Sequence, residues 1–336
     1  MESLLTIVIP TYNRADCLSL LLTTLTEELC GLEEKVRVIV GDNASTDHTP
    51  AVTNAFLAAN PTAEILRHSE NLGADENFCR CIDNAHSQFF WIIGDDDLPK
   101  SGVLAAVVAL LEQEDTDILY LNSEWMPAIR SAKDGEQVAR LTARKLGGED
   151  FAREVNVWVT FISGMVVNRE RLFALNPGLD IRRFNGTCLV QLGWVLPLLM
   201  SGSSFKICGQ RCVLATSGNT GGYGLFTVFG KHFPTILDAV CGSSSLIGRS
   251  ISSQLRWVYI PRLIKGTRFG NIGAFQSEDI LGSLAAFKGS LAYRLAMRPL
   301  IQFPRPLALL VYAVLMLPLL GKRVGARLLG TGGQHE

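Results

Sequence analysis

Three adjacent aspartates, Asp95 to Asp97, carry the strongest chemical signal in the sequence, and they follow the apolar run SQFFWIIG. Three carboxylates this close repel one another unless a cation lies among them. On an extended chain Asp95 and Asp97 would face one side and Asp96 the other. Carboxylate oxygens suit Mg²⁺ or Mn²⁺, ions that often bind substrate phosphates as well. The triplet therefore predicts a divalent-metal site at Asp95 and Asp97. The competing interpretation is a group of acids at a helix N-terminus.

Strand and helix signals alternate over the first 120 residues and would position this triplet. Short apolar runs predict four strands, LLTIVIP, KVRVIVGD, AEILRHS and SQFFWIIGDDD, and residues 15–30, AVTNAFLAAN and NLGADENFCRCIDNA predict helices between them. This alternation implies right-handed crossovers and an α/β fold with a mostly parallel central sheet and flanking helices. Ligands of such sheets bind at the carboxyl ends of the strands. Polar clusters at 11–14, 42–47 and 95–97 follow those ends and should therefore meet.

The pattern is less regular after Asp117. DILYLNSEW and VWVTFISGMVVNRE read as strands, the second with a turn at Ser163-Gly164, and CLVQLGWVLPLLMSG reads as an apolar helix. Residues 130–150 are polar and predict a loop or hairpin. Four glycines within Gly218 to Gly224 predict a mobile loop.

Four motifs in register, TIVIPTYNR, VGDNASTDHT, ENLGADENF and WIIGDDD, make residues 4–125 resemble the family 2 glycosyltransferases, which have the GT-A (Rossmann-like) fold. The resemblance implies that Asp42 recognises the nucleobase and that Asp95 and Asp97 bind Mn²⁺ or Mg²⁺ together with the donor diphosphate, beside Asp96. It also implies that further residues line the nucleotide pocket: Pro10, Thr11, Tyr12, Arg14, Asp47, Asn71, Gly73 and Arg80. Either arginine could pair with phosphate, or form an ordinary surface ion pair.

The second half of the chain resembles the family more weakly. ISGMVVNRE matches the segment leading to the acceptor site, but Thr187 and Gln191 stand where many relatives have an acidic pair that supplies the general base. Transfer needs a group that accepts the hydroxyl proton, so Asp180 is the candidate base; a solvated loop aspartate is the alternative. The resemblance is closest to abequosyltransferase-like enzymes, which add a deoxysugar to a lipid-linked O-antigen unit.

Several other residues have two interpretations each. His232 could be a third metal ligand or an ordinary structural histidine. Four aromatic residues could stack on an acceptor sugar or belong to the core: Trp158, Trp194, Tyr223 and Phe226.

The composition of the chain argues against nucleic acid as a partner and indicates a reducing compartment. With 31 basic and 32 acidic residues the net charge is −1, which gives no electrostatic footprint for nucleic acid. Eight cysteines without a C-x-x-C pair indicate idle thiols in a reducing compartment.

The excess apolarity, a mean hydropathy of +0.23, is concentrated at residues 306–320, between basic residues on both sides. This run is short for a membrane span, and prolines at 304, 306 and 318 should interrupt a helix. It predicts a helical element on a membrane surface, with a true span or a buried hairpin as alternatives.

These observations predict a GT-A domain over residues 1–225, with a nucleotide-sugar half (1–125) and an acceptor half (126–225), and a helical membrane-associating region at 226–336. The expected activity is metal-dependent inverting transfer of a (deoxy)sugar to a lipid-linked glycan, at the cytoplasmic face of a bacterial inner membrane. One rival is a sugar nucleotidyltransferase, although PTYNRAD lacks the glycine-rich loop expected after its first strand. Another is a non-catalytic, membrane-bound sugar-binding protein.

Overall fold

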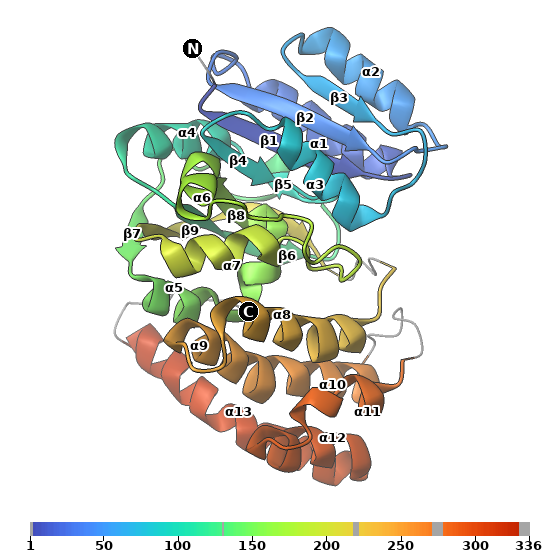
Figure 1. Cartoon of the computed structure of the whole chain (residues 1–336), viewed down its shortest axis with the longest axis vertical. Coiled ribbons are helices and arrows are strands. Elements are labelled where there is room, and N and C mark those ends of the chain that lie inside the picture. Colours follow the sequence, from blue (N-terminus) through green and yellow to red (C-terminus); the bar gives the residue numbers. More distant parts are fainter. Residues whose placement is uncertain (1–2, 130, 218–221, 271–277, 329–336) are drawn as a thin grey trace. The chain divides into compact units, whose positions relative to one another are not determined.

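The computed structural model describes residues 3–129, 131–217, 222–270 and 278–328 (Figure 1). For residues 132 and 318–328 it describes the backbone only. The chain divides into two compact units, Met1–Asn219 and Thr220–Glu336. This division lies within the glycine-rich stretch, six residues before the expected boundary at 225.

A nine-stranded sheet forms the centre of the first unit, in the order β3-β2-β1-β4-β8-β6-β9-β5, with β7 paired to β9. The strands are β1 (Leu5–Thr11), β2 (Val36–Asp42), β3 (Glu64–Arg67), β4 (Phe89–Ile92), β5 (Leu98–Pro99), β6 (Ile118–Met126), β7 (Ala143–Leu146), β8 (Met165–Asn168) and β9 (Phe205–Thr216). Strands β3, β2, β1 and β4 are parallel neighbours. β8 runs antiparallel between β4 and β6, and β9 is parallel to β6, whereas β5 and β7 oppose β9. Six of the nine strands therefore share one direction, which confirms the mostly parallel sheet.

Helices cover both faces of the sheet because its central strands are apolar on both sides. The helices of this unit are α1 (Ala15–Glu28), α2 (Thr49–Ala59), α3 (Ala74–Asn84), α4 (Val103–Gln113), α5 (Gly148–Val155), α6 (Arg169–Leu175) and α7 (Leu192–Ser201), with short 3₁₀ turns η1 (Ala132–Asp134), η2 (Asn156–Thr160) and η3 (Ile162–Gly164). Alternate residues of β1, such as Ile7 and Ile9, share a core cluster with α1 and α4. On α3, Asn77 donates to the Gly41 carbonyl of β2 over 2.8 Å. The α/β architecture with flanking helices is confirmed.

In the second half of this unit one prediction was wrong and one strand was missed. The expected strand VWVTFISG is instead the 3₁₀ turns η2 and η3, and only Met165–Asn168 forms a strand. Asn156 has a positive φ of 46°, which turns the backbone away from an extended course. The 12-residue strand β9 was not predicted, because charged and polar residues interrupt its apolar pattern.

All secondary-structure elements in the described part of the second unit are helices or helical turns (Figure 1). The elements are η4 (Thr227–His232), α8 (Phe233–Cys241), α9 (Leu246–Gln254), η5 (Leu255–Tyr259), α10 (Ile260–Phe269), α11 (Ile280–Ser283), η6 (Ala285–Phe287), η7 (Tyr293–Met297), α12 (Arg298–Gln302) and α13 (Arg305–Leu328). Segments η4, η5 and η7 are π-helical. The predicted mobile loop lies largely outside the described residues.

Helix α13 corrects the expectation that prolines interrupt the apolar segment. Pro306 lies in its first turn, where a missing backbone N–H is tolerated, and the helix continues through Pro318. Among the described residues, no helix is both long and apolar enough to cross a bilayer.

Candidate nucleotide-sugar site

The three aspartates lie in a tight turn rather than on an extended strand. Strand β4 ends at Ile92, and the amide of Asp97 donates to the Gly94 carbonyl over 3.0 Å. The predicted alternation of Asp95 and Asp97 about Asp96 is therefore wrong, because the chain reverses before the side chains can alternate. We call residues 94–97 the acidic turn.

Asp95 and Asp96 are held by residues at the carboxyl end of β1. Thr11 Oγ1 donates to Asp95 Oδ2 over 2.7 Å. The Arg14 guanidinium bridges both carboxylates, at 3.1 Å from Asp95 Oδ1 and 3.2 Å from Asp96 Oδ2. Burial raises the pKa of Asp95 to about 6, against the opposing effects of Arg14 and Thr11. The predicted meeting of the first and last polar clusters is thus observed.

Asp97 is held by residues next to β8 and β9, in the other half of the sheet. Its Oδ2 accepts a 2.5 Å hydrogen bond from Ser163 Oγ, and its Oδ1 accepts from the Thr216 amide at 3.2 Å. Thr216 also donates its hydroxyl to the Asp96 carbonyl at 2.8 Å. Burial, followed by repulsion from Asp96, raises the pKa of Asp97 to about 7. Sequence reasoning missed Thr216 because its strand was not predicted.

Gly94 permits this close packing. A Cβ at Gly94 would lie 3.3 Å from Asp96 Oδ1 and Asp97 Oδ2, and 3.5 Å from Ser163 Oγ. Its amide also donates to Ser163 Oγ over 2.9 Å. The carboxylates therefore fold back over Gly94, where a side chain would displace them.

Asp42 ends β2 in a fully buried position. Its Oδ1 accepts from the Ser45 amide at 2.9 Å, and its Oδ2 pairs with Arg67 Nε at 3.1 Å. Arg67 is the last residue of β3 and was not singled out from the sequence. Carboxylate oxygens can accept several hydrogen bonds, so Asp42 has capacity for a further N–H beside Ser45 and Arg67.

The loops after β1 and β2 are joined to each other. Asn13 has a positive φ of 52°. Its side-chain oxygen accepts from the Thr46 amide at 2.7 Å, and its backbone N–H donates to Ser45 Oγ at 2.9 Å. Asp47 accepts from the amides of Ala15 and Thr49, at 3.1 and 2.9 Å. Asp47 thus stabilises the starts of α1 and α2, where orphan amides need acceptors.

Asn43 joins the loop after β2 to the loop that leads into α3. Its side chain donates to Asn71 Oδ1 at 2.8 Å and to the Gly73 carbonyl at 3.2 Å. Gly73 has a φ of 84° and precedes α3 directly. Asn71 and Gly73 are therefore tied to the loop after β2. Pro10 is buried within β1, whereas Tyr12 is 42% exposed beyond its end.

Arg80 and Asp180 belong to a different contact network. Arg80 Nε pairs with Glu76 Oε1 on α3 at 3.2 Å, which matches the surface ion-pair interpretation. Asp180 is exposed, and its Oδ1 accepts from the Arg182 amide at 2.9 Å. Arg182 in turn pairs with Glu76 at 3.1 Å. The structure thus places Asp180 at the start of a turn that is fastened to α3.

Thr187 and Gln191, at the positions expected to be acidic, form structural hydrogen bonds, Thr187 within this turn and Gln191 to the 3₁₀ turn η2. Thr187 Oγ1 donates to the Phe184 carbonyl at 2.6 Å, and Gln191 donates to the Thr160 carbonyl at 2.8 Å. Asp75 Oδ2, on α3, accepts from the Cys188 amide at 2.9 Å. Burial raises the pKa of Asp75, although the backbone hydrogen bonds oppose this.

The aromatic candidates divide between core and surface. Trp194 is 1% exposed and packs against Phe90, so it is a core residue. Trp158 is half-buried against Trp125, with ring centroids 5.3 Å apart, and Trp125 is 40% exposed. His232, Tyr223 and Phe226 lie in the second unit, so the roles considered for them stay predictions.

The charges of the acidic turn suit a divalent cation. The turn carries three carboxylates, and the guanidinium of Arg14 pairs with two of them, Asp95 and Asp96. Among the described residues, Asp97 forms no ion pair. No cluster of three or more metal-binding side chains occurs in the described part of the chain. Two carboxylates are nevertheless a usual protein contribution for Mg²⁺, which completes its shell with waters and substrate phosphates. Asp95 and Asp97 therefore fit such an ion.

Comparison with protein-family models matches residues 6–128 to "Glycosyl transferase family 2". Abequosyltransferase RfbV of Salmonella typhimurium is 33% identical over 114 residues, which cover 33% of each chain. A PGL/p-HBAD biosynthesis glycosyltransferase of Mycobacterium tuberculosis is 32% identical over 116 residues, 34% of this chain and 44% of that protein. The matched segments thus span less than half the length of these relatives.

Solved structures show the same fold at low identity. S. aureus TarS 1-349 in complex with UDP-GlcNAc has a TM-score of 0.57 at 13% identity and covers 100% of this chain and 94% of its own. The mannosyltransferase PcManGT of Pyrobaculum calidifontis, in complex with GDP-Man and Mn²⁺, has a TM-score of 0.54 at 17% identity. It covers 94% of this chain and 86% of its own.

Proposed function

Because residues 6–128 form a family 2 glycosyltransferase domain, we propose that the chain transfers a sugar from a nucleotide-sugar donor to an acceptor glycan. The observation that carries this proposal is the acidic turn, held between the end of β1 by Thr11 and the end of β9 by Thr216. A cluster of buried carboxylates with raised pKa values at the strand ends is costly unless a ligand uses it.

The donor's nucleoside lies, in this proposal, between the ends of β1 and β2. Asp42 would accept an N–H of the base, while Arg67 holds its carboxylate in place and Asn13 and Asp47 hold the surrounding loops together. The complexes of the two structural neighbours with UDP-GlcNAc and GDP-Man support a nucleoside-diphosphate sugar as donor.

Asp95 and Asp97 would hold Mn²⁺ or Mg²⁺. When bound, this ion supplies positive charge that stabilises the departing diphosphate. Ser163 and Thr216 fix the carboxylate of Asp97, so it need not reorganise when the donor binds. Arg14 offsets part of the charge of Asp95 and Asp96 and would also pair with the diphosphate of the donor.

Transfer in this proposal inverts the anomeric centre. The acceptor hydroxyl attacks the anomeric carbon from the side opposite the nucleotide, the bond from that carbon to the diphosphate oxygen breaks, and the hydroxyl proton passes to a base. Asp180 remains the candidate base, since its turn is fastened to α3 through Arg182 and Glu76.

The acceptor would be a lipid-linked glycan of the O-antigen type, as the similarity to abequosyltransferase RfbV supports. The exposed apolar stripe of α13, Leu307, Leu310, Val314 and Leu317, supports contact with a membrane surface at the cytoplasmic face. Exposed arginines at 294, 298 and 305 suit anionic headgroups. Flotation with vesicles containing anionic lipid tests this contact; Leu310→Ser/Leu317→Ser should abolish it.

Slow hydrolysis of a nucleotide sugar in the absence of acceptor tests the proposal as a whole. We expect UDP- or GDP-sugars, or another member of a nucleotide-sugar panel, to be hydrolysed with Mn²⁺ by the wild type and not by Asp97→Ala. Asp150→Ala, at an exposed residue of α5, is the matched control. Binding of a nucleotide sugar without hydrolysis or transfer to any glycan acceptor would instead favour a non-catalytic sugar-binding protein.

A further inference from the structure

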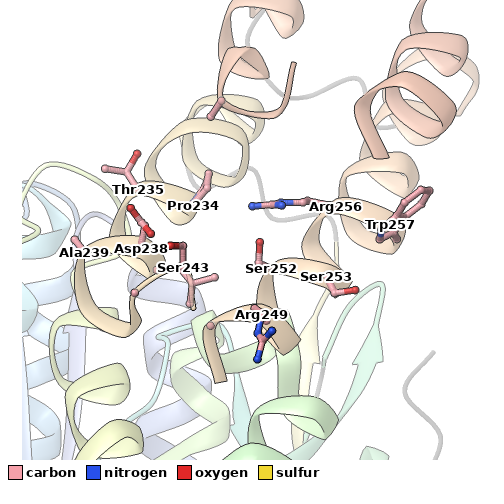
Figure 2. A pocket seen from close by; sticks show the side chains of 14 residues that line it. Pro234, Thr235, Asp238, Ala239, Ser243, Arg249, Ser252, Ser253, Arg256 and Trp257 are labelled. Carbon is pink, nitrogen blue, oxygen red and sulfur yellow. The ribbon is translucent and has the colours of Figure 1, made fainter. Parts of the chain in front are cut away.

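The second unit contains a cavity of its own, of about 750 Å³ and with a mixed polar and apolar lining, between α8 and the helix formed by α9 and η5 (Figure 2). This volume lies in the range of about 300–1,000 Å³ usual for small-molecule sites. Its lining includes Asp238, Ser243, Ser252 and Arg256. The cavity is lined by residues between 234 and 257 and by Ala286, and by none of the donor-site residues.

The two walls of the cavity are set by the turn between α8 and α9. Gly242, at a φ of 72°, ends α8, and the hydroxyl of Ser245 accepts from the Gly248 amide at 2.9 Å to start α9. A Cβ at Gly248 would lie 2.8 Å from the Gly242 carbonyl oxygen, so the turn is tight. The backbone thus fixes the spacing of the side chains above it.

Arg256 is the principal polar group of the cavity. It lies on the π-helical segment η5, a distortion that is frequent at functional sites. Its guanidinium lies 5.7 Å from the ring centroid of Phe287, and its Nε is buried without a hydrogen-bond partner among the described residues. A buried donor without a partner is unfavourable, so a small shift of the side chain that lets a ligand accept from Arg256 would be favoured.

Donors and acceptors are mixed around this arginine. In Figure 2 the guanidinium of Arg256 and the hydroxyl of Ser252 point into the space, with the carboxylate of Asp238 on the α8 side. Asp238 forms no ion pair with Arg256 in the described structure. Arg249 also lines the cavity, but in Figure 2 its side chain extends away from Arg256, on the side opposite the Ser252 hydroxyl. A sugar ring offers hydroxyls that both accept from Arg256 and donate to Asp238.

We propose that this cavity is a carbohydrate-binding site, separate from the donor site, in which Arg256 and Asp238 bind the hydroxyls of a neutral sugar. That its natural occupant is a residue of the acceptor glycan rests on the proposed function. Ser243, in the turn after α8, and Ser252, on α9, supply further hydroxyls to the lining.

Saturation-transfer NMR on the full chain tests the proposal with D-mannose, D-galactose, L-rhamnose, L-fucose and N-acetylglucosamine as probes. At least one sugar should bind, and Arg256→Met and Asp238→Asn should each weaken that binding by about tenfold or more. Arg262→Met, at an exposed arginine on α10, is the matched control and should bind like the wild type.

Nucleotide-sugar hydrolysis measured in the same variants separates this proposal from the proposed function. Hydrolysis unchanged in Arg256→Met and Asp238→Asn would show that both variants fold and keep the donor site. Binding of none of the sugars, or equal binding by all variants, would overturn the carbohydrate site. Binding of inorganic pyrophosphate in place of sugar, lost in Arg256→Met, would overturn it too.

Discussion

Ser163 Oγ donates to Asp97 Oδ2 over 2.5 Å, although 66 positions separate the two residues. Through this bond the turn before β8 holds the acidic turn after β4. The same hydroxyl accepts from the Gly94 amide, so one side chain fixes both ends of the acidic turn.

Ser163→Ala should alter the titration of Asp97 more than the fold. Loss of the hydroxyl removes a hydrogen bond that stabilises the ionised carboxylate, so the pKa of Asp97 should rise above about 7. The acidic limb of the pH profile for nucleotide-sugar hydrolysis should therefore move to higher pH. A profile unchanged in position, at lower amplitude only, would show that Ser163 acts by packing alone.

Gly94→Ala should weaken nucleotide binding on the order of tenfold, because the added Cβ would lie 3.3 Å from carboxylate oxygens of Asp96 and Asp97. Gly147→Ala is the matched control, since nothing lies within 4 Å of its Cβ position. Isothermal titration with nucleoside diphosphates and Mn²⁺ measures both variants. Equal affinities for the two would show that the acidic turn tolerates displacement.

Without metal, the buried carboxyl of Asp97 should make the chain less stable as pH rises. Its pKa is about 7 in the folded chain against 3.8 as the unperturbed value, so the folded state binds more protons between these limits. Unfolding free energy therefore falls as pH rises through this window. Asp97→Asn should reduce this loss in thermal melts with EDTA at pH 5 and pH 8. A wild-type chain whose melting temperature changes with pH as the variant's does would contradict the burial of an ionisable Asp97.

Asp180→Asn should abolish sugar transfer while nucleotide binding and fold remain. Its carboxylate accepts from the Arg182 amide, and an asparagine keeps that hydrogen bond but removes the basic oxygen. Transfer assays with lipid-linked glycan extracts and Mn²⁺-dependent nucleotide titration measure the two properties. Full transfer by Asp180→Asn would exclude Asp180 as the base.

The parallel half of the sheet could be predicted because its signals are local. Each of β1, β2 and β4 is a short apolar run that ends in polar residues, and parallel strand ends share one edge. The pairing of Thr11 and Arg14 with Asp95 follows from that edge. Which carboxylates share Arg14 did not follow, because the turn at Gly94 reverses the chain within four residues.

The second half could not be predicted to the same extent because it depends on contacts between distant residues. Strand β9 has polar residues in its middle, at Gln210 and Arg211, and is a strand only because β6, β5 and β7 pair with it. Thr216, at its end, therefore had no sequence signal as a partner of Asp97. Arg67 could have been found, since it lies within the predicted third strand and pairs in register with Asp42.

The measurement that tests the central claim most directly is the binding of nucleoside diphosphates, with and without Mn²⁺, to wild type, Asp97→Asn and Asp150→Asn. If Asp95 and Asp97 hold the diphosphate through a divalent ion, Mn²⁺ should strengthen binding of UDP, GDP, CDP or dTDP by wild type and Asp150→Asn. Asp97→Asn should lose that enhancement. Equal enhancement by Mn²⁺ in Asp97→Asn would contradict the account, because the ion would then bind without the acidic turn.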